Sequence, residues 1–482
     1  MTDLTQLPAT EISARVRAKQ LSPVEVVEAA LERVNQLDPE LHAFVELTAE
    51  RALAQAAELA AKIARGEDPG PLAGVPIAVK DLIATAGIPT RSGSPAYRNF
   101  VPDEDDVAVE RVVAAGAVVL GKTTVPEFGY SGAGHNPISP AARNPWNPAL
   151  TPGGSSAGSG VAVATGMSPV ALGSDGGGSI RIPASLCGIY GFKASMGRVP
   201  LYPGCRDERY PGLSSWESLE CIGPMTRTVA DAALLMSVLA GPDPRDRLSI
   251  PSGDVDWLTA IEGDVRGLRV AYSPDFGYLA VDPEVRRVAE DAVGVLRDLG
   301  CKVETVTPDW VNPQATFWGL VAADSDLTGM RAMAETYGEE MSPHLLDLLQ
   351  KPWTAEQLTD ARRDRKAFAN KMWRLMEDYD LLVTPTLTAP PFPVGMQGPE
   401  LVDGRMVPNN AWTGFAFPVN LTGQPAASCP AGYTKDGLPV GIQIIGRHLA
   451  DASVLAASAA FESARPWKDA WPPAIPASSS SQ

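Results

Sequence analysis

The first 65 residues place hydrophobic side chains at helical spacing. The segment "SPVE", Ser22 to Glu25, offers an N-cap serine, a proline at the first helical position and a glutamate at the third. Apolar residues then recur on one helix face, and the alanine-rich segment "ERALAQAAELAAKIARG" continues the pattern as far as Gly66. The sequence therefore predicts a helical arm over residues 1–66.

From Pro71 onward, short apolar runs alternate with amphipathic helices. "GVPIAVK" and "AVVLG" predict strands, with a helix over "DDVAVERVVAAG" between them. "LRVAYSP", "DPEVRRVAEDAVGVLRDLG" and "KVETV" form a β-α-β pattern, and "PAASCPAGY" and "LPVGIQIIGR" predict a hairpin. We expect an α/β fold with a mixed sheet, one domain over 67–470 that is continuous with the arm, and a flexible tail over 471–482.

Charge and cysteine content exclude several classes of partner. The chain of 482 residues has a formal net charge of −17, which disfavours nucleic acid and anionic membranes. Its five cysteines lie far apart without a C-x-x-C pair, so neither a disulfide framework nor a zinc ribbon is expected. The N-terminus has no secretory pattern, and the least polar stretch is too short for a membrane span. These features favour a cytoplasmic protein.

Two short motifs match known patterns in the wrong context. "GAVVLGKT", residues 116–123, fits the P-loop pattern, but a helix precedes it and the interval between its glycines is itself a predicted strand. "GSSAG", residues 154–158, fits the nucleophile elbow, but a proline-rich loop precedes it where a buried strand is required. We expect neither a nucleotide site nor an elbow serine.

The four histidines give no support to a histidine base or a metal site. None of them forms an H-x-x-x-H pair, and acidic side chains do not cluster at metal-ligand spacing. His344 is interpreted as a solvated helix residue near an N-cap, and His448 as a surface residue after the last strand. We therefore expect no metal and no cofactor.

Two glycine- and serine-rich segments lie close together in the chain. They are "PGGSSAGSG", residues 152–160, and "GSDGGGSIRIPAS", residues 173–185, and the small apolar segment between them predicts a buried helix. An isolated Gly-Ser cluster is more often a helix cap or a turn. Three consecutive glycines, however, lose much backbone entropy on folding. This cost is expected where exposed backbone N–H groups are needed as donors beside a nucleophile.

An amide-cleaving serine also requires a base. Lys80 ends the apolar run "AGVPIAVK", and burial of its amine would lower the pKa enough to provide a neutral form. The alternative is a lysine at the sheet edge whose amine reaches the solvent.

The chain resembles the amidase signature family of Ser-cisSer-Lys hydrolases. The similarity lies in "LAGVPIAVKDLI", "TPGGSSAGSGVAVATGMSPVALGSDGGGSIRIPASLCGIYGFKAS" and "FPVNLTGQPAASCPAGYTKDGLPVGIQIIGR", and it extends over nearly the whole chain. It implies a large mixed sheet with helices on both faces. By resemblance, Ser179 is the nucleophile, Ser155 the bridging serine in a cis peptide, and Lys80 the base.

The resemblance also suggests how the nucleophile is supported. The N–H groups of Gly176, Gly177, Gly178 and Ser179 are expected to form the oxyanion hole. Ser156 is expected to act as a supporting donor beside the bridging serine. Asp175 and Arg181 flank the nucleophile, and we expect them to pair and to fix the glycine loop. The chain departs from many family members at Ser174 and at Gly176.

Substrate contacts are expected from two loops. Gly129 and Tyr130, in "FGYSG", fall where related enzymes approach the acyl group. The insert "LYPGCRDERYPGLSSWESLECIGP" supplies Tyr202, Tyr210 and Trp216, which form either an apolar rim or ordinary packing contacts.

These features predict an amidase that cleaves a small aryl or aliphatic amide through an acyl-enzyme on Ser179. A carbamate (urethane) or ester hydrolase on the same triad stays open, because the tetrahedral intermediate is shared. The amidase subunit of a tRNA-dependent amidotransferase is a second alternative, although the insert and "TFWGL" differ from the corresponding amidotransferase segments. The third alternative is a non-catalytic binding protein. The oligomeric state is left open between a monomer and a homodimer.

Overall fold

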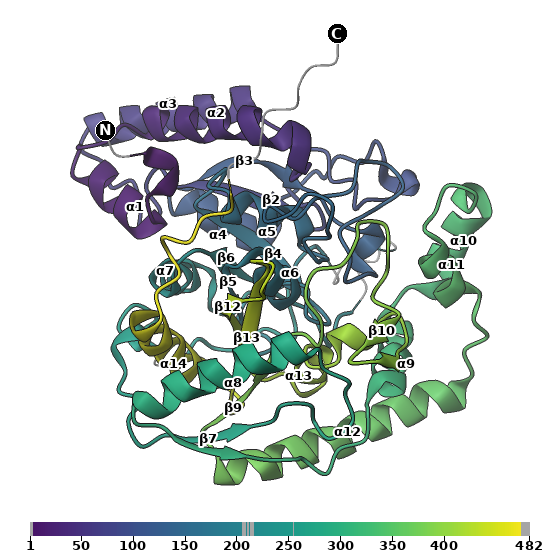
Figure 1. The fold of residues 1–482 in the computed structure, drawn as a ribbon. Coiled ribbons are helices and arrows are strands. Elements are labelled where there is room, and N and C mark those ends of the chain that lie inside the picture. The colour runs from purple at the N-terminus through teal and green to yellow at the C-terminus, as the bar shows by residue number, and fades with distance from the viewer. Residues whose placement is uncertain (1–2, 205–208, 210–211, 213–215, 254, 474–482) are drawn as a thin grey trace.

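The computed structural model describes residues 3–204, 209, 212, 216–253 and 255–473. Its centre is an 11-stranded mixed sheet with the strand order β1-β3-β2-β4-β6-β5-β12-β13-β9-β7-β8 (Figure 1). These strands are β1 (Phe44–Leu47), β2 (Pro76–Lys80), β3 (Val118–Thr123), β4 (Val170–Asp175), β5 (Tyr190–Lys193), β6 (Cys221–Thr226), β7 (Arg269–Tyr272), β8 (Lys302–Thr305), β9 (Leu381–Pro385), β12 (Ala426–Tyr433) and β13 (Pro439–Gly446). A separate two-stranded ribbon joins β10 (Leu401–Val402) and β11 (Arg405–Met406).

Helices cover both faces of the sheet. They are α1 (Ala9–Arg17), α2 (Pro23–Leu41), α3 (Ala49–Ala64), α4 (Val107–Ala114), α5 (Ala157–Ala164), α6 (Arg181–Cys187), α7 (Val229–Leu239), α8 (Pro283–Asp298), α9 (Gln314–Asp324), α10 (Leu327–Tyr337), α11 (Pro343–Gln350), α12 (Ala355–Asp378), α13 (Phe417–Thr422) and α14 (Asp451–Ala464). Helices α2 and α3 lie at one end of the molecule and α12 at the other, while α10 and α11 extend from one side (Figure 1).

The predicted fold class is confirmed, and several local signals occur where the sequence places them. Helix α2 begins with a capping box of Ser22 and Glu25. Asp282 accepts a hydrogen bond from the Glu284 N–H at 2.8 Å and caps α8, which connects the parallel strands β7 and β8. Strands β12 and β13 form the predicted antiparallel hairpin.

Two segments differ from the sequence-based expectation. Residues 1–66 are not wholly helical, because β1 lies between α2 and α3 and pairs antiparallel with β3. The apolar segment predicted as one buried helix divides into α5 and β4. Gly166 adopts a φ of +74° after α5, and Pro169 follows, so the helix cannot continue through both positions.

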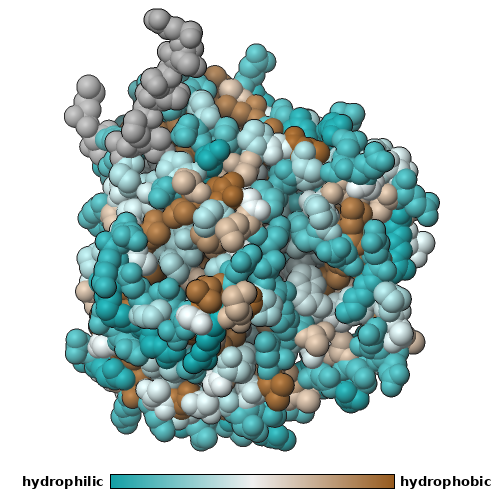
Figure 2. All heavy atoms as spheres, turned by 45° about the vertical axis from the view of Figure 1, so that its right-hand side comes forward, coloured by the Kyte–Doolittle hydropathy of each residue, from teal (hydrophilic) through white to brown (hydrophobic). Residues whose placement is uncertain are grey.

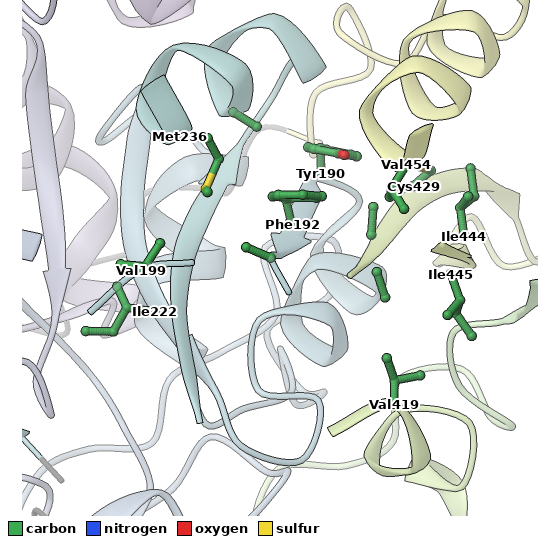
Figure 3. Packing of buried hydrophobic residues seen from close by; sticks show 14 of the residues in the cluster. Tyr190, Phe192, Val199, Ile222, Met236, Val419, Cys429, Ile444, Ile445 and Val454 are labelled. Atoms are coloured by element: carbon green, nitrogen blue, oxygen red, sulfur yellow. The ribbon is translucent and has the colours of Figure 1, made fainter. Parts of the chain in front are cut away.

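Side chains from the middle of the sheet and from the covering helices form the hydrophobic core. Tyr190 and Phe192 of β5 lie beside Met236 of α7, and Ile444 of β13 packs near Val454 of α14 (Figure 3). Full burial of a side chain such as Ile444 stabilises the fold by about 1.5–3 kcal/mol. The core thus provides a rigid support for the strand ends.

The face of the molecule drawn in Figure 2 is largely polar. Figure 2 shows one face on which hydrophobic residues form small separate groups among hydrophilic ones. In the described part of the chain, no helix has both the length and the apolar character that a membrane span requires. Of the predicted tail, residues 474–482 lie outside the described residues.

Candidate active site

The ends of two parallel neighbouring strands bring the predicted lysine to the glycine-rich segment. Lys80 is the last residue of β2 and Asp175 the last of β4, with Val79 opposite Leu172 in the register. Parallel strands end at the same edge of a sheet, so Lys80 meets the residues around Ser174 there. The Lys80 side chain is 1 % exposed, which excludes a lysine that reaches the solvent.

The amine of Lys80 is surrounded by oxygen atoms. Its Nζ lies 2.7 Å from Ser155 Oγ, 2.8 Å from Ser174 Oγ and 3.1 Å from the Ser174 carbonyl oxygen. Burial lowers the pKa of Lys80 to about 8, although the negative charges of Glu220 and Asp175 oppose this shift. About a tenth of the amine is therefore neutral at pH 7, far more than for a free lysine.

Ser155 and Ser179 face a common small cavity next to Lys80. The Gly154–Ser155 peptide bond is cis. Gly129 packs against this serine: its φ is +79°, and a Cβ added there would lie 3.3 Å from Ser155 Oγ. Among the described residues, the Ser179 side chain has no hydrogen-bond partner, which leaves its oxygen accessible to a substrate. Catalytic hydrogen bonds often tighten only when substrate binds.

Ser156, the other serine of the elbow-like motif, supports the strand end. Its Oγ donates to the Ser174 carbonyl at 3.2 Å and accepts from the Ser174 N–H at 3.3 Å. Its own N–H donates to the Ser179 carbonyl at 3.2 Å. Ser156 thereby links the segment that carries Ser155 to the segment that carries Ser179.

The glycine run leaves room for two aromatic rings. A Cβ on Gly176 would lie 2.4 Å from Cε3 of Trp216, and one on Gly177 would lie 2.7 Å from Cζ of Phe317. Real Cβ atoms essentially never approach a heavy atom below 3.0 Å. The departure from the family pattern at Gly176 is therefore matched by an indole that fills the space of the missing side chain.

The N–H groups expected in the oxyanion hole do not have equal surroundings. Gly178 has a φ of +120°, and its N–H donates to Asp175 Oδ1 at 2.8 Å. This donor is therefore engaged within the protein. The N–H groups of Gly176, Gly177 and Ser179 stay candidates for the oxyanion.

Asp175 and Arg181 form a fully buried ion pair behind the glycine run. Arg181 Nη2 lies 2.8 Å from Asp175 Oδ1, and Asn420 Nδ2 donates to the same oxygen at 2.9 Å. Arg181 also donates to Gln443 Oε1. Burial by itself raises the pKa of Asp175, but the charge and hydrogen bonds of Arg181 outweigh it and hold that pKa well below its ordinary value. The ionised carboxylate therefore anchors the loop.

Ser179 also lines a larger cavity, of about 320 Å³. Gly129, Tyr130 and Trp216, the three predicted substrate contacts, all line it. The rings of Tyr130 and Trp216 meet edge to face at a centroid distance of 5.2 Å. Further apolar side chains of its wall are Ile182, Phe317, Trp318, Leu348, Trp412 and Phe417. The cavity suits an aromatic or aliphatic group.

The other aromatic residues of the insert have different positions. The guanidinium carbon of Arg245 lies over the Tyr202 ring, 5.4 Å from the ring centroid. Tyr202 is not among the described residues that line the large cavity. Tyr210 lies outside the described residues.

The interpretation of His344 as a solvated residue is wrong. Its ring lies in the wall of the large cavity, and burial lowers its pKa to about 4, so the imidazole is neutral at physiological pH. Gln397 Nε2 lies 3.2 Å from His344 Nδ1 and 3.0 Å from His135 Nε2. Sequence reasoning missed this polar wall, because nothing in the local pattern connects α11 to Gln397.

The P-loop-like motif has a structural role. Its lysine, Lys122, lies within β3 with no exposed surface, donates to Thr90 Oγ1 at 2.7 Å and is 3.9 Å from Asp81. It is therefore unavailable to a phosphate. In the described part of the chain, no group of three or more His, Cys, Asp or Glu side chains is arranged to hold a metal ion.

The chain is similar to known proteins over almost its whole length. The Amidase family model matches residues 25–455. An acylamidase of Rhodococcus erythropolis is 40% identical over 98% of both chains, and a glutamyl-tRNA(Gln) amidotransferase subunit of Chloroflexus aurantiacus is 36% identical over 97% of this chain and 98% of its own. The crystal structure of a bacterial aryl acylamidase superimposes with a TM-score of 0.88 and 34% identity over 96% of each chain.

The family model, an acylamidase relative and an aryl acylamidase structure all identify the same kind of enzyme. The protein is an amidase, a hydrolase that acts on carbon–nitrogen bonds other than peptide bonds. The chain belongs to the amidase signature family.

Proposed function

We propose that the protein hydrolyses a small aryl or aliphatic amide through an acyl-enzyme on Ser179, with Ser155 as the proton bridge and Lys80 as the base. One observation carries this proposal. The Lys80 Nζ is 2.7 Å from Ser155 Oγ, and Ser155 faces the same small cavity as Ser179.

In the acylation step, neutral Lys80 takes the proton of Ser155 while Ser155 takes the proton of Ser179. The Ser179 oxygen forms a bond to the amide carbon, and the carbonyl electron pair moves to the oxygen. Backbone N–H groups of the glycine run stabilise this oxyanion, and each such donor is worth roughly 3 kcal/mol. The proton then returns through Ser155 to the nitrogen as the C–N bond breaks, which releases the amine and leaves an ester on Ser179.

Water completes the cycle by the same route. A water molecule gives one proton through Ser155 to Lys80 and adds its oxygen to the ester carbon. Collapse of the second intermediate breaks the bond to Ser179, and the proton returns to the Ser179 oxygen. The acid product leaves with the enzyme restored.

The aromatic wall of the large cavity supports an aryl or alkyl group as part of the substrate. The printed names of an acylamidase relative and an aryl acylamidase structure fit this substrate class. A carbamate or an ester would pass through the same tetrahedral intermediate. A panel of one anilide, one primary amide, one carbamate and one ester, compared by kcat/KM, ranks these classes.

The catalytic assignment is tested with Ser179→Ala, Ser155→Ala and Lys80→Ala. We expect each to lower kcat for a chromogenic anilide by at least about 10³-fold, as loss of a group in a nucleophile–base unit does. A fluorophosphonate probe should add its mass to the peptide that contains Ser179 and to no peptide of the alanine variant. Undiminished turnover by Ser179→Ala would refute the proposal.

The alternative of an amidotransferase component makes a different prediction. Such a component releases ammonia from glutamine for a partner protein, whereas the proposed enzyme turns over amides alone. We also propose a cytoplasmic enzyme without a nucleic-acid partner, which the net charge of −17 supports. Size-exclusion chromatography of the pure chain, together with a glutaminase assay, distinguishes the alternatives and determines whether the chain is a monomer or a homodimer.

A further inference from the structure

Ser174 supplies most of the surroundings of the Lys80 amine. It is the penultimate residue of β4, 2 % exposed, and opposite Ile222 of β6 in the sheet. Its hydroxyl oxygen and its carbonyl oxygen lie 2.8 Å and 3.1 Å from Lys80 Nζ. The third contact of the amine is Ser155 Oγ.

The number of donors and acceptors around Lys80 fixes the direction of its lone pair. A neutral amine has two N–H groups and one lone pair. The Ser174 carbonyl can only accept, so it takes one N–H. If Lys80 is the base, its lone pair must face the Ser155 hydroxyl. The Ser174 hydroxyl oxygen is then the acceptor for the second N–H.

The same three oxygens also satisfy the protonated amine. An ammonium has three N–H donors and no acceptor. Ser174 keeps both of its contacts, and Ser155 Oγ changes from donor to acceptor. The proton therefore moves between Ser155 and Lys80 without displacement of a heavy atom, which keeps the site preorganised.

Backbone hydrogen bonds hold Ser174 in place beside the Lys80 amine. Ser174 has paired backbone in the sheet, and its N–H and carbonyl both contact Ser156 Oγ. The Ser174 backbone therefore has a fixed position beside β2, the strand that carries Lys80, and its hydroxyl oxygen contacts the amine from there.

We propose that the Ser174 hydroxyl is a positioning group that accepts one N–H of Lys80 and thereby directs the lone pair of the amine at Ser155. The inference rests on the proposed function, because it requires Lys80 to act as a base. It predicts two effects of removing the hydroxyl. The lone pair loses its orientation, so kcat falls, and a buried ammonium loses one acceptor, so the pKa of Lys80 falls further.

The test compares Ser174→Thr with Ser174→Val, two side chains of the same shape that differ in the hydroxyl. We expect kcat of the valine variant to be about tenfold or more below that of the threonine variant, with KM within about twofold. The acidic limb of the kcat/KM profile should lie at lower pH in the valine variant. Ser168 is a buried serine whose hydroxyl donates to the Val170 carbonyl at 2.6 Å. Ser168→Ala is the matched control and should leave kcat and the acidic limb of the pH profile unchanged.

Equal kcat and an equal acidic limb in the threonine and valine variants would overturn the inference. Melting temperatures of both variants establish that they are compared as folded proteins. Ser179→Ala distinguishes a failure of the proposed role of Ser174 from a failure of the proposed function. If that variant is inactive while Ser174→Val matches Ser174→Thr, only the role of Ser174 fails. If Ser179→Ala is active, the proposed function itself fails.

Discussion

At the scale of single residues, the proposed role of Lys80 as the base predicts how activity depends on pH. Its pKa is lowered to about 8 by burial, against the opposing charge of Glu220, which borders the same small cavity. A base acts only when it is deprotonated, so kcat/KM should rise with pH and level off above about 8. The pH profile of kcat/KM for an uncharged amide measures this limb.

Removal of the Glu220 charge should move that limb. Glu220→Gln takes away a negative charge that favours the protonated amine, so the pKa of Lys80 falls and activity persists to lower pH. Glu28→Gln, at an exposed position of α2, is the matched control and should not shift the profile. A limb that stays in place, or one that moves to higher pH, would contradict the electrostatic account.

The contact between Gly176 and Trp216 predicts a second effect at this scale. Gly176→Ala places a Cβ 2.4 Å from the indole, so the ring must move out of the cavity wall. Overpacking of this kind typically costs about 1–3 kcal/mol. We expect a lower melting temperature and a lower kcat/KM for an aryl substrate. Trp216→Ala in the same chain should restore the stability of Gly176→Ala, which the double-mutant cycle measures.

At the scale of elements, the sequence predicted those site residues that lie at the end of an element or inside the glycine-rich motif. The apolar strand before Lys80 and the glycine run before Ser179 made both residues candidates, and the resemblance to the amidase signature family assigned their roles. The role of Ser174 was not predictable in this way. Its contact with Lys80 depends on the register between β2 and β4, which is set by tertiary pairing and not by either strand alone. Phe317 and His344 reach the cavity from α9 and α11, and no local pattern indicates that.

The ion pair at the N-terminal end of α6 predicts a large effect on stability. Arg181→Ala leaves the carboxylate of Asp175 buried without its main partner, which typically costs about 3–5 kcal/mol. Urea unfolding at neutral pH should show this loss. Arg287→Ala, which removes an exposed ion pair with Asp291 on α8, is the control and should change stability by less than about 1 kcal/mol.

The pH dependence of this ion pair has a definite sign. The pKa of Asp175 is lower in the folded protein than in the unfolded chain, so the folded state binds fewer protons at acidic pH. The contribution of the pair is fully present above the ordinary carboxyl pKa and decreases as the pH falls below it. The stability difference between wild type and Arg181→Ala should therefore shrink on acidification. A difference that grows instead would refute this assignment.

At the scale of the whole molecule, the N-terminal helices are joined to the large sheet by more than a linker. β1 pairs with β3, and a cluster of buried residues from α2, α3 and β3 covers this end of the sheet. Val27 of α2 and Leu120 of β3 both belong to this cluster and are fully buried. The sequence pattern located the helices of the arm correctly. It could not reveal that β1 ties them into the sheet, because four residues of mixed polarity carry little strand signal.

This arrangement predicts that residues 1–66 and the domain over residues 67–470 unfold together. Leu120→Ala removes a buried side chain from the shared cluster, and such substitutions cost about 2–5 kcal/mol. If the molecule is one cooperative unit, the variant should lose helical circular dichroism and amidase activity in a single coincident transition at a lower temperature. Leu258→Ala, at a side chain that is 49% exposed, should leave the transition where it is. An early loss of helical signal while activity persists would mean that the arm unfolds independently and that its contacts with β3 do not support the active site.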